Sequence, residues 1–212
     1  MNINNIVEKL DHHKTNLVDI LSGKNWGHFR SYFFIREKTI KKEFDDNFKS
    51  TFCSFYILNG PTGLNNLQKN RFFQLLVNKE DDMGKLLNDL YLIPGYGGSN
   101  RLHLSFCSKL IHTLDYTSPI YDKNVASILE LSSPTQTGGV GEKITNRVLI
   151  YKELQEKSDG LLKDSRIKKY IISIRKDLQD KAKREHFNWQ NTLISDEKLL
   201  DSLLWALYTT KN

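Results

Sequence analysis

The sequence predicts an all-α fold, built as one domain of two helical lobes that share a cleft. Apolar residues recur at three- and four-residue spacings along most of the chain, as on the buried face of an amphipathic helix. Alternating apolar and polar residues, which would indicate strands, extend over no long segment, and only residues 51–58 form an ambiguous apolar run. Hydrophobic residues make up 39% of the 212, which is enough for a sizeable core in one domain spanning residues 1–212.

The predicted helices follow one another in order. Residues 3–21 are amphipathic, and residues 26–42 carry an unusually aromatic face that is typical of a core. The break at NGPTG separates these from a helix at 65–78. The remaining helices are predicted at 85–92, about 100–115, 122–131, 142–158, 163–186 and 195–208, with a loop at 133–141.

The charge of the chain favours a polyanionic partner. The net charge is +6 and the pI is near 9.1, which favours nucleic acid first. Basic residues gather in the C-terminal helices, within 142–208. Taken alone, these residues are interpreted as solvated helix faces with ion pairs such as Lys181–Glu185. If the protein binds nucleic acid, they are instead a candidate surface for phosphate contacts.

The compartment is expected to be intracellular. No apolar run reaches eighteen residues, and the first residues lack a signal-peptide core, so we expect a cytoplasmic monomer without membrane contact. Cys53 and Cys107 lie in apolar surroundings and are expected to be reduced core thiols. Two cysteines are too few for an iron–sulfur cluster. His12 and His13 have no third ligand nearby in the sequence, so no metal site is expected.

The segment Ile93-Pro94-Gly95-Tyr96-Gly97 joins two predicted helices. Two glycines one residue apart allow a tight turn with amide groups at a helix start, a geometry that binds phosphate oxygens. The sequence therefore predicts a helix–hairpin–helix unit over about 85–131. The residues expected to contact DNA there are Pro94, Gly95, Tyr96, Gly97, Gly98, Ser99 and Arg101.

A second glycine pair competes for this role. Gly139-Val140-Gly141 also precedes a predicted helix, but the Gly-Lys-Ser/Thr ending of a nucleotide-binding P-loop is missing. Only the first pair is followed by a helix that ends at a proline and a carboxylate, Pro119-Ile120-Tyr121-Asp122. We therefore interpret the second pair as a loop.

Asp122 has two interpretations. It lies where a helix begins, so its simplest role is an N-cap for that helix. A carboxylate fixed near a phosphate-binding hairpin also suits an enzyme that cleaves an N-glycosidic bond, because it can stabilise positive charge on the deoxyribose and orient water or an amine.

IPGYG, the following helix and PIYD together resemble the helix–hairpin–helix DNA glycosylases. A narrower resemblance, over roughly residues 52–208, is to a group of bacterial proteins with the 8-oxoguanine DNA glycosylase fold. The segments that carry it are FYILNGPTGL, SFCSKLIHTL, PIYD and LLDSLLWAL. The resemblance implies two helical lobes, binding of double-stranded DNA and flipping of one nucleotide. It makes Asp122 the catalytic aspartate and Gly95–Gly97 a phosphate grip, often with a monovalent cation.

The sequence departs from this pattern in three ways. From Gly97 to Asp122 it is longer by about one helical turn than the family pattern. Where lyase members carry a nucleophilic lysine, this chain has Ser99, and the nearest substitute is Lys109. If the helix has the extra turn, Lys109 is the Schiff-base nucleophile; otherwise Asp122 and a water do the work. The iron–sulfur ligands of the endonuclease III branch are absent, which agrees with the 8-oxoguanine branch.

Three further residues are candidates for a base pocket. His112 follows Lys109 by three residues, and Asp201 and Trp205 lie on the last predicted helix. For each of them a core, cap or surface role competes with contact to a flipped base.

The leading hypothesis is therefore a DNA glycosylase, with or without strand cleavage, acting on a damaged or modified base in repair or in defence against modified DNA. The alternatives are a non-catalytic helical protein that holds DNA phosphates with the hairpin, and a helical interaction protein whose charge serves solubility. Which base is excised depends on pocket side chains scattered over several helices.

Overall fold

The computed structural model describes residues 3–210, which are helical with connecting turns and contain no strand. The all-α prediction is confirmed. The helices are α1 (Ile3–His12), α2 (Lys14–Ser22), α3 (Gly27–Lys41), α4 (Asp46–Phe55), α5 (Asn66–Val77), α6 (Met83–Tyr91), α7 (Leu104–Leu114), α8 (Lys123–Ile128), α9 (Val140–Lys163), α10 (Ser165–Arg184) and α11 (Asp196–Thr209). Short 3₁₀ turns lie at Lys24–Trp26, Tyr96–Gly98 and Asn191–Leu193.

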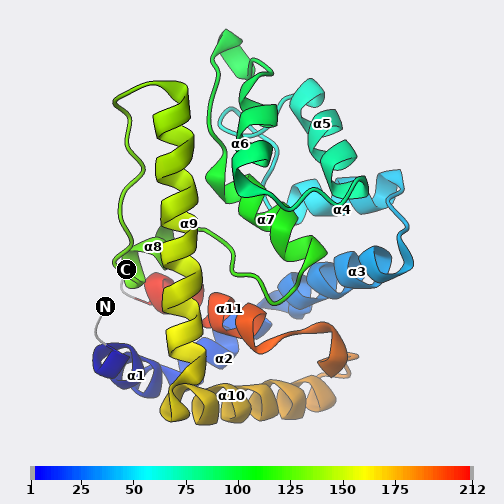
Figure 1. The fold of residues 1–212 in the computed structure, drawn as a ribbon. Helices are drawn as coiled ribbons and strands as arrows, with labels where there is room; N and C mark the ends of the chain where they lie inside the picture. The colour runs from blue at the N-terminus through cyan, green and yellow to red at the C-terminus, as the bar shows by residue number, and fades with distance from the viewer. Residues whose placement is uncertain (1–2, 211–212) are drawn as a thin grey trace.

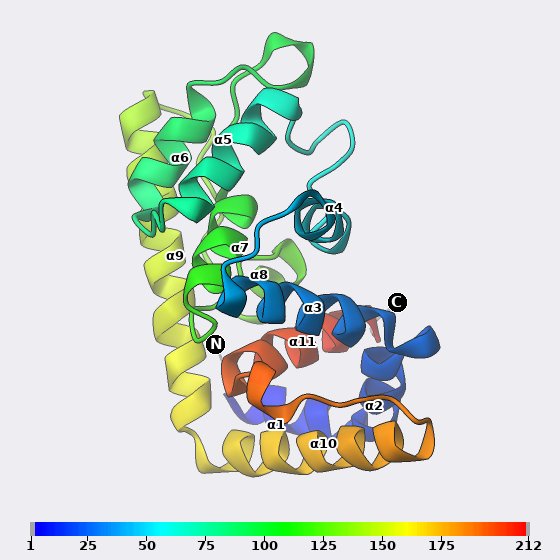
Figure 2. The ribbon, with the colours of Figure 1, turned by 90° about the vertical axis from the view of Figure 1, so that its right-hand side faces the viewer.

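The helices form two groups that α9 connects. Figures 1 and 2 show α4, α5, α6 and α7 at one end and α1, α2, α10 and α11 at the other, with α3 between them. Helix α9 packs against α6 in the first group and against α10 and α11 in the second. The most enclosed helix is α11, which contacts α1, α2, α8, α9 and α10 and has ten buried residues.

Several predicted elements have different boundaries from those the periodicity indicates, and two of them differ in kind. The helix expected at 3–21 is broken at His13 into α1 and α2. The ambiguous run at 51–58 is the second half of α4 and the turn after it. Asp45 starts α4 by accepting a hydrogen bond from the Phe48 amide (2.7 Å), and Phe48 and Phe52 then fall on one buried face.

The aromatic face predicted for residues 26–42 is in the core. Trp26, Phe29 and Phe33 are each at most 3% exposed. Trp26 stacks on Phe187 at 4.7 Å between ring centroids, which joins α3 to the segment that leads into α11. Cys53 and Cys107 are buried free thiols, as predicted.

Two cations of α10, Lys181 and Arg175, form ion pairs with neighbouring helices. Lys181 contacts Asp19 of α2 at 2.7 Å as well as Glu185 at 3.9 Å, which confirms the predicted pair. Arg175 contacts Asp196 at 2.6 Å. Helix α10 lies at the opposite end of the molecule from the turn at Tyr96–Gly98 in both views (Figures 1 and 2). These contacts favour the interpretation of α10 as a solvated, paired face.

In the described part of the chain, no helix combines the length and the apolar character needed to cross a membrane.

Candidate functional site

A pocket of about 160 Å³ contains four of the residues singled out from the sequence: Lys109, Asp122, Asp201 and Trp205. Its walls come from the start of α3, the end of α4, α7, the start of α8 and α11. The lining residues are His28, Phe55, Tyr56, Ile57, Lys109, Ile120, Asp122, Lys198, Asp201, Ser202 and Trp205. Segments far apart in the sequence thus bring two lysines and two aspartates to one small volume.

A larger cavity of about 870 Å³ borders α3, α6, α7 and α9, but two of its carboxylates, Asp82 and Asp115, are engaged in local structure. Asp82 caps α6 through the Lys85 amide (2.6 Å). Asp115 accepts hydrogen bonds from Thr117 (2.7 Å) and Ser118 (2.8 Å). The smaller pocket is therefore the better candidate for chemistry.

Lys109 extends from α7 into aromatic surroundings. Its ammonium donates a hydrogen bond to the Tyr56 carbonyl (3.1 Å) and lies 5.2 Å from the centroid of the Phe106 ring. Burial lowers the pKa of Lys109 to about 8, while the charges of Asp122 and Asp201 raise it and that of Lys198 lowers it. A substantial fraction of Lys109 is therefore uncharged near pH 8, the form in which an amine is a nucleophile.

The Tyr56 carbonyl is free for Lys109 because α4 ends there. The Leu58 amide donates to the Cys53 carbonyl (2.9 Å). The Ile57 amide donates to the Ser54 carbonyl (3.3 Å), and together these are the two hydrogen bonds of a Schellman cap. In this cap Ile57 occupies the left-handed position, with φ of 55°, where glycine is usual. A β-branched residue there is strained, and Ile57 is also 74% exposed.

Asp122 is both an N-cap and a pocket residue. Its Oδ1 accepts a hydrogen bond from the Asn124 amide (2.8 Å), which starts α8. The preceding amide, that of Tyr121, donates to the Ser108 hydroxyl (2.9 Å), and Ser108 is the neighbour of Lys109 on α7. The residue before Lys109 is thus hydrogen-bonded to the residue before Asp122. This bond helps to fix the positions of Lys109 and Asp122 relative to each other.

The residues before Asp122 form a turn, whereas the sequence suggested an extra helical turn. Helix α7 starts at Leu104, later than the expected position near 100, and ends at Leu114. Asp115 then closes the turn through Thr117 and Ser118. The Tyr151 hydroxyl of α9 donates to the Pro119 carbonyl (3.1 Å). The turn is thus held from α7 and α9, and Lys109 reaches the pocket without a longer helix.

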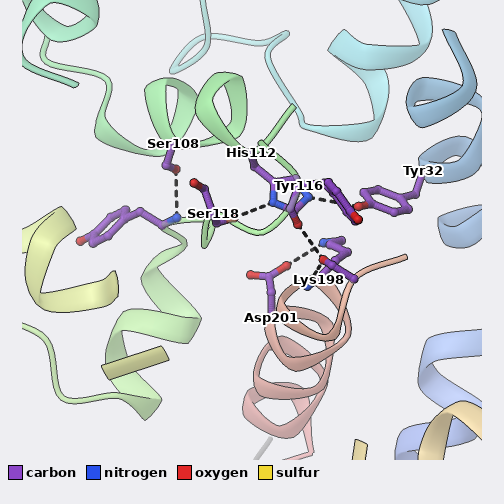
Figure 3. Close-up of polar contacts among 9 residues, drawn as sticks. Tyr32, Ser108, His112, Tyr116, Ser118, Lys198 and Asp201 are labelled. Atoms are coloured by element: carbon purple, nitrogen blue, oxygen red, sulfur yellow. Dashed lines mark hydrogen bonds and ion pairs between the residues drawn. The ribbon is translucent and has the colours of Figure 1, made fainter. Parts of the chain in front are cut away.

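The wall on α11 is a buried ion pair. Lys198 Nζ lies 2.6 Å from Asp201 Oδ2, and the two side chains are only 4% and 10% exposed (Figure 3). The Lys198 ammonium also lies 5.5 Å from the centroid of the Tyr32 ring. Trp205 follows one turn after Asp201 and is 40% exposed. This wall therefore runs from a closed charged end to an aromatic ring that reaches the surface.

His112, expected as a pocket residue, is buried elsewhere on α7. Its Nδ1 contacts the Ser118 carbonyl (2.7 Å) and its Nε2 contacts the Tyr32 hydroxyl (3.2 Å), as Figure 3 shows. Burial lowers the pKa of His112 to about 3. With both ring nitrogens engaged, His112 joins α3, α7 and the turn before Asp122. We therefore correct its role from base contact to support of the site.

The predicted phosphate-binding residues form an exposed turn apart from the pocket lining. The Gly95 amide donates to the Ser99 carbonyl (2.9 Å) and the Gly98 amide to the Gly95 carbonyl (3.1 Å). Gly97 and Gly98 have φ of 71° and 75°, which only glycine adopts easily. The α5 cap residue Asn65 fixes the turn by donating to the Pro94 carbonyl (2.8 Å). Tyr96, Ser99 and Arg101 are exposed.

Sequence reasoning missed His28, Ile57, Lys198 and Ser202. A signal for two of them is present on the last helix. Residues 198, 201, 202 and 205 are spaced i, i+3, i+4 and i+7, so they lie on one face of a helix whose other residues after the first turn are mostly apolar and buried. A polar face on a buried helix indicates a site. Nothing in the sequence around His28 or Ile57 indicates that they line it.

Within residues 3–210, no three His, Cys, Asp or Glu side chains are grouped so that they could hold a metal ion. No protein-family model, curated protein or solved structure matches the chain. The pocket itself is therefore the basis for assigning a function.

Proposed function

We propose that the protein is a DNA glycosylase with associated lyase activity, which excises a damaged or modified base from double-stranded DNA. The observation that carries this proposal is the convergence of Lys109 and Asp122 on one pocket of about 160 Å³. A lysine with a lowered pKa beside a fixed carboxylate is the pair that cleavage of an N-glycosidic bond needs.

In the proposed reaction, the uncharged amine of Lys109 attacks C1′ of the flipped deoxyribose. The new N–C1′ bond forms as the bond from C1′ to the base breaks, and the base leaves with the bonding electrons and takes up a proton. Loss of a proton from the lysine nitrogen and opening of the sugar ring give a Schiff base. Elimination from that Schiff base then breaks the DNA strand on the 3′ side.

Asp122 stabilises the positive charge that develops on the sugar while the base departs. Its hydrogen bond to the Asn124 amide fixes the carboxylate before substrate binds. If Lys109 remains charged, Asp122 can instead orient a water that attacks C1′, which gives base release without a nick. The two routes differ in product, so product analysis separates them.

We extend the proposal to the fold around the pocket. We assign α6, the turn at Tyr96–Gly98 and α7 to the helix–hairpin–helix unit, and the two helix groups on either side of α3 to the two lobes. The exposed glycine turn is suited to grip a DNA phosphate, with a monovalent cation as in the family, and Arg101 adds a charge beside it.

Ile57 is suited to fill the gap that a flipped nucleotide leaves in the duplex. It is an exposed apolar side chain in a strained backbone position beside the pocket. Apolar wedges inserted between base steps are a common device of proteins that distort DNA. The α4 cap holds Ile57 in this strained backbone conformation, which indicates that Ile57 has a role other than stabilising the fold.

The experiment that tests this function is a panel of duplex oligonucleotides, each with one modified base, assayed for free base and for strand nicks. The wild-type protein is expected to release at least one base and to nick the product strand. Lys109→Gln and Asp122→Asn are expected to bind the same duplexes without release. A wild-type protein that binds DNA and releases no base across the panel would instead be a non-catalytic DNA-binding protein.

A further inference from the structure

Two polar atoms in the pocket lack a hydrogen-bond partner in the described part of the chain. They are His28 Nε2 and Ser202 Oγ, both buried, and both residues line the pocket. Ser202 as a whole is only 2% exposed. Because buried polar groups in native proteins are almost always paired, two such atoms in one small pocket indicate a ligand that pairs with them.

Neighbouring side chains hold both groups in place. Ser202 lies on α11 directly after Asp201, which is fixed by its ion pair with Lys198. The His28 ring contacts Phe29 edge-on at 5.4 Å and Phe55 at 5.0 Å between centroids. The two atoms therefore belong to rigid elements, α3 and α11, and their positions are set before a ligand arrives.

The charge state of these groups limits what they can bind. Burial, with a smaller contribution from the Lys198 charge, lowers the pKa of His28 to about 3. His28 is therefore neutral at pH 7, with one ring nitrogen as donor and the other as acceptor. The Ser202 hydroxyl can donate or accept, and the opposite charges of Lys198 and Asp201 offset each other.

We propose that His28 and Ser202 select the excised base, and that this base is uncharged and carries an N–H beside a C=O on the edge that enters the pocket. This inference rests on the proposed glycosylase function. The C=O accepts a hydrogen bond from one residue and the N–H donates to the other. A cationic N-alkylated base is rejected, because Asp201 is already paired with Lys198 and the His28 imidazole is neutral, so this end of the pocket offers the cation no unpaired negative charge.

Two nearly isosteric variants test the assignment. Ser202→Ala removes only the hydroxyl oxygen, and His28→Phe keeps a flat ring against Phe29 and Phe55 without nitrogen atoms. Because neither polar atom has a hydrogen-bond partner among residues 3–210, both variants are expected to melt at the wild-type temperature or above. Ser22→Ala is the matched control, a serine 1% exposed on α2 whose hydroxyl bonds to the Asp19 carbonyl and lies outside the pocket.

The substrates are duplexes with one uracil, hypoxanthine or 8-oxoguanine, and duplexes with one 3-methyladenine or 7-methylguanine. Wild type is expected to release bases of the first group only. Ser202→Ala and His28→Phe are each expected to lower kcat/KM by about 10- to 100-fold, while Ser22→Ala leaves it unchanged. Binding to a duplex with a stable abasic-site analogue, which has no base, should be the same in all four proteins.

Two results overturn the inference: unchanged release by both variants, or preferred release of the methylated cationic bases. If wild type releases no base at all, the proposed function fails, and this result differs from both of those outcomes. In that case the ¹⁵N shifts of the His28 ring are followed while free uracil and hypoxanthine are added. A shift that is lost in Ser202→Ala supports base binding by this pair, and no shift in wild type overturns it.

Discussion

The pocket is built from two walls whose lysines have different surroundings. On the α11 wall, Lys198 is almost fully buried and lies 2.6 Å from Asp201. On the α7 wall, Lys109 donates to a backbone carbonyl and forms no ion pair with a described residue. A lysine buried among rings loses its proton more easily than one in water, because burial disfavours the charged ammonium.

This difference assigns separate roles to two residues of the same type. Lys198 is suited to hold Asp201 in place through their buried ion pair. Lys109 is the amine that can become neutral, with a pKa of about 8. In the proposed reaction, the surroundings of a side chain, rather than its identity or its presence in a cavity, decide which lysine can attack the sugar.

The largest effect is expected from Lys109→Gln. Loss of the amine removes the nucleophile, so strand nicking should fall by about 10³-fold or more, while the fold and DNA binding persist. The measurement is single-turnover cleavage of a duplex with one abasic site, which does not depend on which base the protein excises.

Lys198→Met is the matched substitution on the other wall. It leaves Asp201 buried without its partner, so thermal or urea unfolding should show a loss of about 3–5 kcal/mol. The folded fraction should still nick the abasic duplex. Equal loss of nicking by both variants at full folding would mean that the two lysines do not have separate roles.

Asp122→Asn should have the next largest effect, a fall in base release of about 10²- to 10³-fold. Asparagine caps a helix about as well as aspartate, so the variant separates the charge from the cap at the start of α8. Asp122→Ala should lose the same activity and a further ~1 kcal/mol of stability. Normal base release by the asparagine variant, measured under single turnover, would reduce Asp122 to a cap.

The pH dependence of nicking should follow the proton of Lys109. Below a pKa of about 8 the rate should rise about tenfold per pH unit, and above it the rate should level off. The Asp122 charge raises the pKa of Lys109, so removing that charge should move the rising limb of the pH–rate profile to lower pH. The comparison uses abasic duplex with wild type and Asp122→Asn. A limb that moves upward in the variant would contradict the assignment.

The smallest effect is expected from Ile57→Gly, and its two parts have opposite signs. Glycine adopts the positive φ of the α4 cap without strain, so the variant should gain about 1 kcal/mol in unfolding free energy. Base release should fall about tenfold, since no side chain fills the gap in the duplex. Cleavage of an already abasic site should change less. A variant that loses stability would show that Ile57 is a packing residue.

The sequence was sufficient for most of the helices, although not for α4, and for part of the site. Periodicity predicts the helices because each buries one apolar face, and Pro119 followed by Asp122 marks the start of α8. Lys109, Asp201 and Trp205 could be singled out as candidates, but not placed together, because the pocket depends on how α7 and α11 pack. His112 illustrates the limit: its spacing from Lys109 agrees with a shared face, yet the turn before Asp122 engages both ring nitrogens.

The residues that the sequence missed share a physical reason. His28 becomes a pocket residue only through its contacts with Phe29 and Phe55, which are tertiary. Ile57 stands where local rules predict glycine, so sequence patterns give no reason to expect a helix cap there. Such departures from local preference are expected where function, not stability, selects the residue.

The most direct test of the account is to reduce and identify the covalent intermediate. Wild-type protein is mixed at pH 8 with a duplex containing one abasic site, and borohydride is added to convert a Schiff base into a stable amine. Peptide mapping by mass spectrometry is then expected to find the sugar remnant on Lys109. A remnant on Lys198 or on another amine, or no cross-link under conditions where the duplex is bound, would contradict the proposal that Lys109 is the nucleophile.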